Sequence, residues 1–93
     1  MAIYIVTYDL RKGATPEDYQ KLIDLIKEDG SWACLGGSSY LIESECSARE
    51  LRDKFKKVLD DNDMLYVGAV SAPAAWHGYS NEVSQWILKK LNK

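Results

Sequence analysis

Residues 3–10 read Ile-Tyr-Ile-Val-Thr-Tyr-Asp-Leu, a run dominated by the β-branched and aromatic side chains that favour a β-strand. Because the run is apolar on both faces, it is typical of a strand that is covered on both sides. Thr15 and Pro16 then suit the N-cap and the first position of a helix. That helix carries one apolar stripe at helical spacing, formed by Tyr19, Leu22, Ile23 and Ile26. We expect it to end at Asp29-Gly30, since Gly readily takes the left-handed conformation that terminates helices.

The strand and helix pattern continues along the chain. Residues 32–35 and 39–43 predict two strands around Gly36-Gly37, a pair suited to a hairpin turn. Ser47 and Glu50 form a capping box, which predicts a second helix that buries Leu51, Phe55, Val58 and Leu59. Residues 64–70 predict a fourth strand. The order β-α-β-β-α-β predicts an α+β fold, a ferredoxin-like sandwich with two helices on one face of an antiparallel sheet and the first and third strands in its centre.

The C-terminal residues add to this pattern. We expect one domain over residues 1–93, with a ferredoxin-like core at 2–72 and a linker and additional helix at 73–93. The helix starts at Ser80, and its apolar stripe consists of Val83, Trp86, Ile87 and Leu91. Trp76, Tyr79 and Trp86 are expected to hold this helix against the domain. His77, the only histidine, has no evident acid–base partner nearby and is expected to have a surface or packing role.

A sheet of this kind has a second face that its two helices leave open. Alternation along the strands places a set of mainly aromatic residues together, and we expect them on that open face: Tyr4, Val6, Tyr8, Tyr40, Ile42, Tyr66 and Val70. Large apolar patches are rarely left exposed on monomers, so something must cover these side chains. The C-terminal helix, a second subunit and a nucleic acid are the three alternatives.

Charge and cysteine content exclude several classes of protein. The 93 residues include 12 basic and 14 acidic side chains, a net charge of −2, whereas dedicated nucleic-acid binders carry a basic excess. Cys34 and Cys46 lack the spacing of a zinc site and are expected to be reduced. The start of the chain does not resemble a signal peptide, and no apolar run reaches membrane-spanning length. These features favour a cytoplasmic protein with no membrane partner.

Asp9 is the residue most suited to chemistry, because it places a carboxylate at the rim of the sheet where the first strand ends. Mg²⁺ binds through one or two carboxylates and keeps several waters. If a two-fold dimer brought two copies of Asp9 together, they could share a metal ion that activates water against a phosphodiester. The alternative role for Asp9 is structural, as an aspartate that accepts hydrogen bonds from the following loop.

The opening Ile3-Tyr-Ile-Val-Thr-Tyr-Asp-Leu10 and the element order behind it resemble the small CRISPR-associated endonuclease and spacer-adaptation subunits, and also the virulence-associated protein D toxins. The chain is more similar still to small phage and bacterial proteins labelled SinR-like. The resemblance covers residues 2–72 and implies a ferredoxin-like homodimer in which Asp9 binds a divalent metal. The chain departs from nuclease members of the family in offering only Arg11 and Lys12 as basic residues soon after Asp9, and in its tail from Pro73 onward.

Two hypotheses of function follow. The first is a homodimeric, non-catalytic interaction module that binds a protein partner in phage–host defence, with Tyr4, Tyr8, Tyr40, Tyr66, Trp76 and Trp86 at its interfaces and no cofactor. The second is a Mg²⁺-dependent nuclease that hydrolyses RNA or DNA with paired Asp9 residues at the dimer axis. The first strand is also similar to the shorter signature of RNA-recognition modules, in which Tyr4 would stack on a base, but the longer basic signature is absent.

Overall fold

The computed structural model describes residues 2–28 and 30–91 as four strands and three helices. In chain order these are β1 (Ala2–Asp9), α1 (Pro16–Glu28), β2 (Trp32–Gly36), β3 (Ser39–Ser44), α2 (Ala48–Lys56), β4 (Met64–Val70) and α3 (Asn81–Leu91). The predicted α+β class is confirmed. Helix α1 was expected to end at Asp29-Gly30. The structure ends it at Glu28, with Gly30 already outside the helix, and Asp29 lies outside the described residues.

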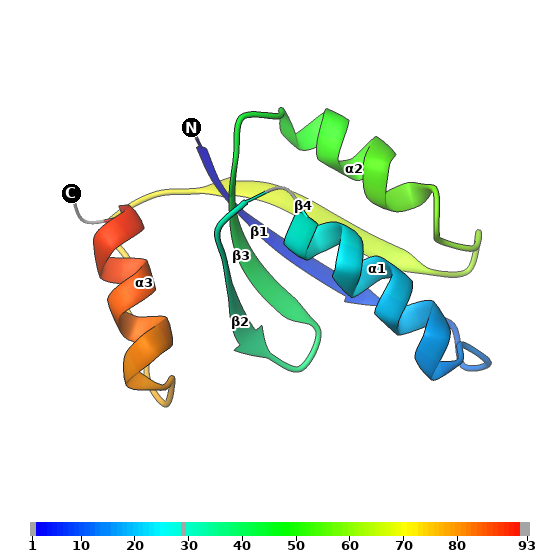
Figure 1. Cartoon of the computed structure of the whole chain (residues 1–93), viewed down its shortest axis with the longest axis horizontal. Helices are drawn as coiled ribbons and strands as arrows, with labels where there is room; N and C mark the ends of the chain where they lie inside the picture. Colours follow the sequence, from blue (N-terminus) through cyan, green and yellow to red (C-terminus); the bar gives the residue numbers. More distant parts are fainter. Residues whose placement is uncertain (1, 29, 92–93) are drawn as a thin grey trace.

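The strands form one antiparallel sheet in the order β2-β3-β1-β4, so β1 and β3 are central as predicted. Figure 1 shows α1 and α2 lying together on one side of this sheet, while α3 stands apart beside β2. The sheet therefore has two different faces. One is covered by α1 and α2, and the other receives α3 over only part of its width.

Local signals in the sequence explain where the elements begin and turn. Gly36 and Gly37 both have positive φ, at 95° and 53°, which lets the chain reverse between β2 and β3. At α2 the capping box is complete: the Glu50 N–H donates to Ser47 Oγ at 3.1 Å, and the Ser47 N–H donates to the Glu50 carboxylate at 2.9 Å. These bonds position α2 so that Leu51 and Phe55 are fully buried against the sheet.

The main core lies between the sheet and the pair α1 and α2. It is built from Leu22 and Ile26 of α1, Leu51 and Phe55 of α2, and side chains from the central strands. The strand residues of this core are Tyr4, Val6, Tyr8, Tyr40 and Ile42, together with Leu10 just after β1.

The prediction that Tyr4, Tyr8 and Tyr40 lie on the open face is therefore wrong. Alternation correctly groups them with Val6 and Ile42, but the group faces the helices. Tyr66 and Val70 do not belong to it, because Tyr66 pairs with Thr7 and Val70 with Ile3, which point the other way. In a strand that is apolar on both faces, alternation shows which residues share a face but not which face meets the helices.

Helix α3 packs on the second face, over the half formed by β2 and β3. Its Ile87 is only 3% exposed, and the Trp86 indole N–H donates to Ser31 Oγ at 2.7 Å. Lys90 pairs with Glu43 of β3 at 2.9 Å. The indole N–H of Trp76 in the preceding linker donates to Ser84 Oγ at 3.0 Å. The expectation that Trp86 holds the last helix against the domain is confirmed, whereas the bond of Trp76 joins the linker to α3 and that role of Tyr79 stays a prediction.

Within the described part of the chain, none of the helices has the length and apolar character needed to cross a membrane.

Candidate functional site

The half of the second face that α3 leaves uncovered ends in four residues that we call the Asp9 corner: the half-buried Thr7 and the exposed Asp9, Met64 and Tyr66. Strand register brings them together, since Thr7 pairs with Tyr66 and Asp9 with Met64. All four side chains lie on the face opposite α1 and α2. Met64 is 62% exposed and Tyr66 is 60% exposed, the two highest values among the large hydrophobic side chains of the described residues. Two such side chains side by side form an exposed apolar patch. They border a shallow recess of about 200 Å³.

Tyr66 lies along its own strand rather than projecting into solvent. A Cβ atom built at Gly68 would stand 2.7 Å from Tyr66 Cε1 and 2.9 Å from its hydroxyl oxygen, so the ring covers the backbone at Gly68. Any larger residue at position 68 would displace the ring. Nearby, Ser39 Oγ donates to the Thr7 hydroxyl at 3.2 Å. The corner is therefore a mostly apolar surface with one carboxylate at its rim.

Asp9 has the exposure expected of a functional carboxylate. It is the last residue of β1 and is exposed, and within residues 2–28 and 30–91 its carboxylate forms no hydrogen bond or ion pair. The structural role considered for it, accepting hydrogen bonds from the next loop, belongs instead to Asp63. The Asp63 carboxylate accepts from the N–H of Arg11 at 2.7 Å and from the N–H of Asp60 at 2.8 Å.

Arg11, the basic residue nearest to Asp9 in sequence, is held by acidic groups. Its guanidinium lies 2.9 Å from Asp63, 2.9 Å from Asp18 and 4.0 Å from Asp60. Burial alone would raise the pKa of Asp63, but the hydrogen bonds from Arg11 and Asp60 outweigh it and lower that pKa. The hydrogen bond to Asp63 in turn raises the pKa of Arg11. A guanidinium committed to carboxylates in this way is poorly placed to bind a phosphate group.

The remaining predicted site residues are dispersed. Tyr4, Tyr8 and Tyr40 are buried in the core, where the Tyr4 hydroxyl donates to the Cys46 carbonyl at 2.7 Å. Burial, with a contribution from Cys34, raises the pKa of Tyr40 to about 12. None of the three tyrosines offers a surface to a partner or a base, which corrects their assignment to an interface and removes Tyr4 as a stacking ring.

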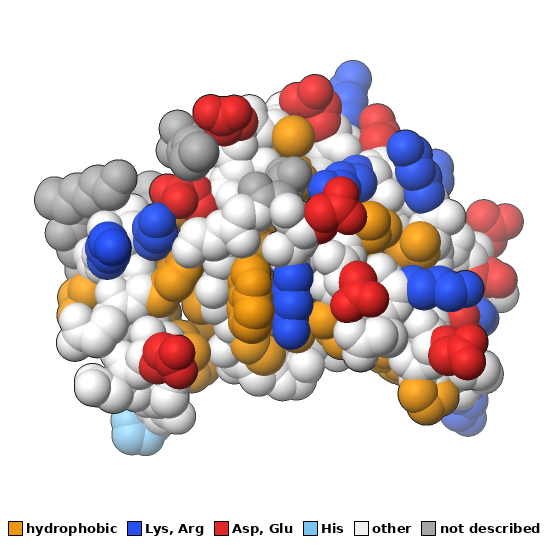
Figure 2. All heavy atoms as spheres, in the orientation of Figure 1, with side chains coloured by type: hydrophobic (Ala, Val, Ile, Leu, Met, Phe, Trp, Pro, Cys, Tyr) orange, Lys and Arg blue, Asp and Glu red, His pale blue; other side chains and the backbone are white. Residues whose placement is uncertain are grey.

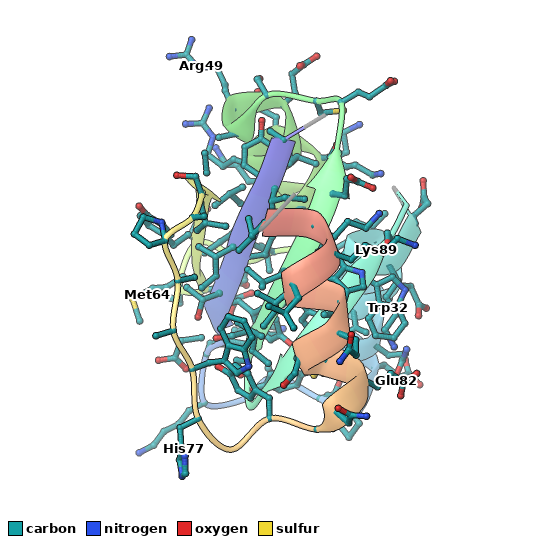
Figure 3. All side chains as sticks on the ribbon, turned by 90° about the vertical axis from the view of Figure 1, so that its left-hand side faces the viewer. Trp32, Arg49, Met64, His77, Glu82 and Lys89 are labelled. Carbon is teal, nitrogen blue, oxygen red and sulfur yellow. The ribbon has the colours of Figure 1, made fainter. Side chains whose placement is uncertain are left out.

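The tail residues and the thiols lie away from the Asp9 corner. Figure 3 shows His77 on the exposed linker, pointing away from the sheet. Cys34 and Cys46 are both free thiols, as expected.

The chemistry of the corner is that of one carboxylate beside apolar groups. In the part of the chain that the structure describes, no three His, Cys, Asp or Glu side chains are grouped so as to hold a metal ion. A hard cation at Asp9 needs further oxygen ligands, and a second copy of Asp9, water and a substrate phosphate are the groups that suit it.

Thr7 and Met64 are the residues of the corner that sequence reasoning missed. The sequence shows Met64 only as the first residue of a strand without any charged residue, and its position opposite Asp9 is visible only in the strand register. No family model matches this chain, and comparison with curated proteins and with solved structures likewise gives no match.

Proposed function

We propose that this chain forms a ferredoxin-like homodimer and works as a non-catalytic interaction module. The strand order β2-β3-β1-β4, with α1 and α2 on one face, supports the ferredoxin-like topology. The setting in phage–host defence comes from the resemblance of the β1 sequence to CRISPR-associated subunits. The cytoplasm is the compartment that this role requires.

The exposed apolar surface of the Asp9 corner carries the proposal. Met64 and Tyr66 stand next to each other on one face of an edge strand that contains no charged residue. Edge strands of monomeric proteins are usually protected by charges, prolines or covering elements. A second copy of the chain suits this surface, since a two-fold axis through it would bury both pairs of side chains against each other.

The neutral character of the surroundings also favours a protein partner over a nucleic acid. The net charge is −2, and Arg11 is bound to Asp18 and Asp63. Binding to a phosphate backbone depends on several free cationic side chains, which release counterions from the nucleic acid. The environment of Asp9 lacks such a cluster among the residues described.

A Mg²⁺-dependent nuclease is the second candidate, and the free Asp9 carboxylate is the observation that favours it. A two-fold axis close to the corner would bring two Asp9 carboxylates together, and a divalent cation between them would offset their repulsion. The metal would then supply a nucleophilic water, and each Asp9 would fix the position of the ion.

Two measurements test the proposal. Light scattering at tens of micromolar should give the mass of a dimer, twice 10.5 kDa or 21 kDa, and a monomer throughout would contradict it. Incubation of RNA and DNA with Mg²⁺ or Mn²⁺ should show no cleavage. Cleavage by the wild type that is lost in Asp9→Asn would establish the nuclease instead.

A further inference from the structure

A second surface lies at the opposite edge of the sheet, between β2 and α3. It is a groove of about 350 Å³ lined by Trp32, Ala33 and Cys34 of β2 and by Glu82, Val83 and Trp86 of α3. Figure 2 shows hydrophobic side chains gathered in the middle of this face, between α3 and α1, with a basic side chain directly beside them. The volume is within the range of ligand-binding pockets, and three consecutive residues of β2 line one side of it.

The register of β2 directs backbone groups into this groove. The Glu43 N–H donates to the Ser31 carbonyl at 2.9 Å, which makes residues 31 and 43 a hydrogen-bonded pair. Such pairs alternate along an antiparallel ladder, so Ala33 turns its N–H and C=O toward β3. The N–H and C=O groups of Trp32 and Cys34 therefore point outward, which is the arrangement that an added strand requires.

The walls of the groove are held in place before anything binds. On one side, the bond from Trp86 to Ser31 fixes α3 at the start of β2. On the other, the Trp32 ring packs edge-on against Tyr40 with 6.0 Å between ring centroids, and Lys27 Nζ lies 4.3 Å from the Trp32 ring centroid. A preformed groove costs little ordering on binding.

The two ends of the groove carry opposite charges. Lys90, near the end of α3, pairs with Glu43, which is bonded to Ser31 just before β2. Helix α3 therefore runs antiparallel to β2 (Figure 1), and Glu82 in its first turn lies toward the Cys34 end. Lys27 lies at the Trp32 end. Figure 3 shows Glu82, Trp32 and Lys89 along one side of α3, with Glu82 at one end and Lys89 toward the other.

We infer that this groove binds an extended segment of a partner protein as a fifth strand, antiparallel to β2. An antiparallel strand places its N-terminal end beside Glu82 and its C-terminal end beside Lys27. The segment therefore has a basic residue at its N-terminal end, apolar residues at alternate positions facing Val83 and Trp86, and an acidic residue at its C-terminal end. The inference rests on the proposed function, since it names the partner class of that interaction module.

Two blocked heptapeptides test the charge order: Thr-Lys-Thr-Val-Thr-Val-Asp and its charge-reversed counterpart Thr-Asp-Thr-Val-Thr-Val-Lys. In both peptides the second, fourth and sixth side chains face α3, and the seventh faces the Trp32 ring and Lys27. In ¹⁵N-labelled full-length protein, the first peptide should shift the amide signals of residues 32–36 and the indole signal of Trp86. It should bind about fivefold more tightly than the second, as expected for two exposed charge contacts. The exposed substitution Glu82→Lys should abolish or reverse that preference while leaving the dimer mass unchanged.

Three results would overturn the inference. The first is that the amide signals of residues 32–36 and the Trp86 indole signal do not shift with up to about 2 mM of the first peptide. The second is that both peptides bind with equal affinity. The third is that the same signals shift when the protein concentration alone is raised. The last would show that a second copy fills the groove. Light scattering measures the proposed dimer independently of these peptide experiments. A failure of the strand-addition inference can therefore be distinguished from a failure of the proposed dimer.

Discussion

Replacing Tyr66 by Ala should weaken the proposed dimer strongly while changing the stability of the monomer little. An aromatic side chain buries about 200 Å² when fully covered, and Tyr66 is 60% exposed in the free chain. About 120 Å² is then available for burial, which contributes about 3 kcal/mol at 25 cal/mol per Å². A two-fold interface contains the residue twice, so full burial contributes about 6 kcal/mol. If only half of that area is buried, the loss is about 3 kcal/mol, or roughly 100-fold in dissociation constant.

Sedimentation equilibrium over a wide concentration range measures this loss directly. The matched control is Tyr79→Ala, which removes the same side chain from the linker, where Tyr79 is 37% exposed and outside the Asp9 corner. The control should dimerise like the wild type. A dissociation constant for Tyr66→Ala within about threefold of the wild-type value would refute the placement of the interface at this corner, provided that circular dichroism shows both variants folded.

Three further outcomes are expected. Asp63 should stabilise the fold above the ordinary carboxyl pKa of about 3.9, and this stabilisation should be lost as pH falls through its lowered folded value; acid titration of Asp63→Asn should therefore show lower stability at pH 7 and a weaker acid dependence. Ile87→Ala should cost about 2–4 kcal/mol in urea unfolding because the side chain is buried beneath α3, and an unchanged midpoint would mean that α3 is not docked. Asp9→Asn should change thermal stability by no more than about 0.5 kcal/mol because Asp9 is exposed; a large loss would assign it a structural role.

The sequence was sufficient to predict the strands and helices, because each has a local signal, and to predict which two strands are central in the sheet. The capping box at Ser47 and the glycine pair at Gly36-Gly37 depend only on neighbouring residues, and both are present as expected. The central position of β1 and β3 follows from the handedness of the crossovers. These features do not require knowledge of which side chains meet across the fold.

Apolar character alone could not predict which face of the sheet packs against α1 and α2, because both faces of β1 are apolar. A finer comparison did contain the answer. One alternating set on β1 ends in Thr7 and Asp9, and Thr7 pairs with Ser39 on β3. The other set ends in Tyr8 and Leu10 and is apolar throughout. The set with the polar ends faces away from α1 and α2, since polar groups are tolerated where burial is incomplete.

The exposed state of Met64 and Tyr66 depends on tertiary structure that no local pattern encodes. It arises because α3 packs over β2 and β3 and leaves the Asp9 corner uncovered, and the position of α3 is fixed by distant contacts from Trp86 to Ser31 and from Lys90 to Glu43. The role of Asp63 is similar, since its bonds to the backbone N–H and the guanidinium of Arg11 span 52 residues of sequence. Such pairings are determined by the whole fold.

The two proposed surfaces lie at opposite edges of the sheet, and this separation has a consequence for binding. The order β2-β3-β1-β4 places the Asp9 corner on the β1 and β4 half and the groove along the far edge at β2. A dimer formed through the corner therefore leaves both grooves free. Two copies of one weak segment on a single partner would bind such a dimer far more tightly than one copy, because the second contact is intramolecular. Dimerisation thereby converts a weak strand-addition site into a selective one for partners that present the segment twice, and Tyr66→Ala should remove that gain while the affinity for a single segment stays the same.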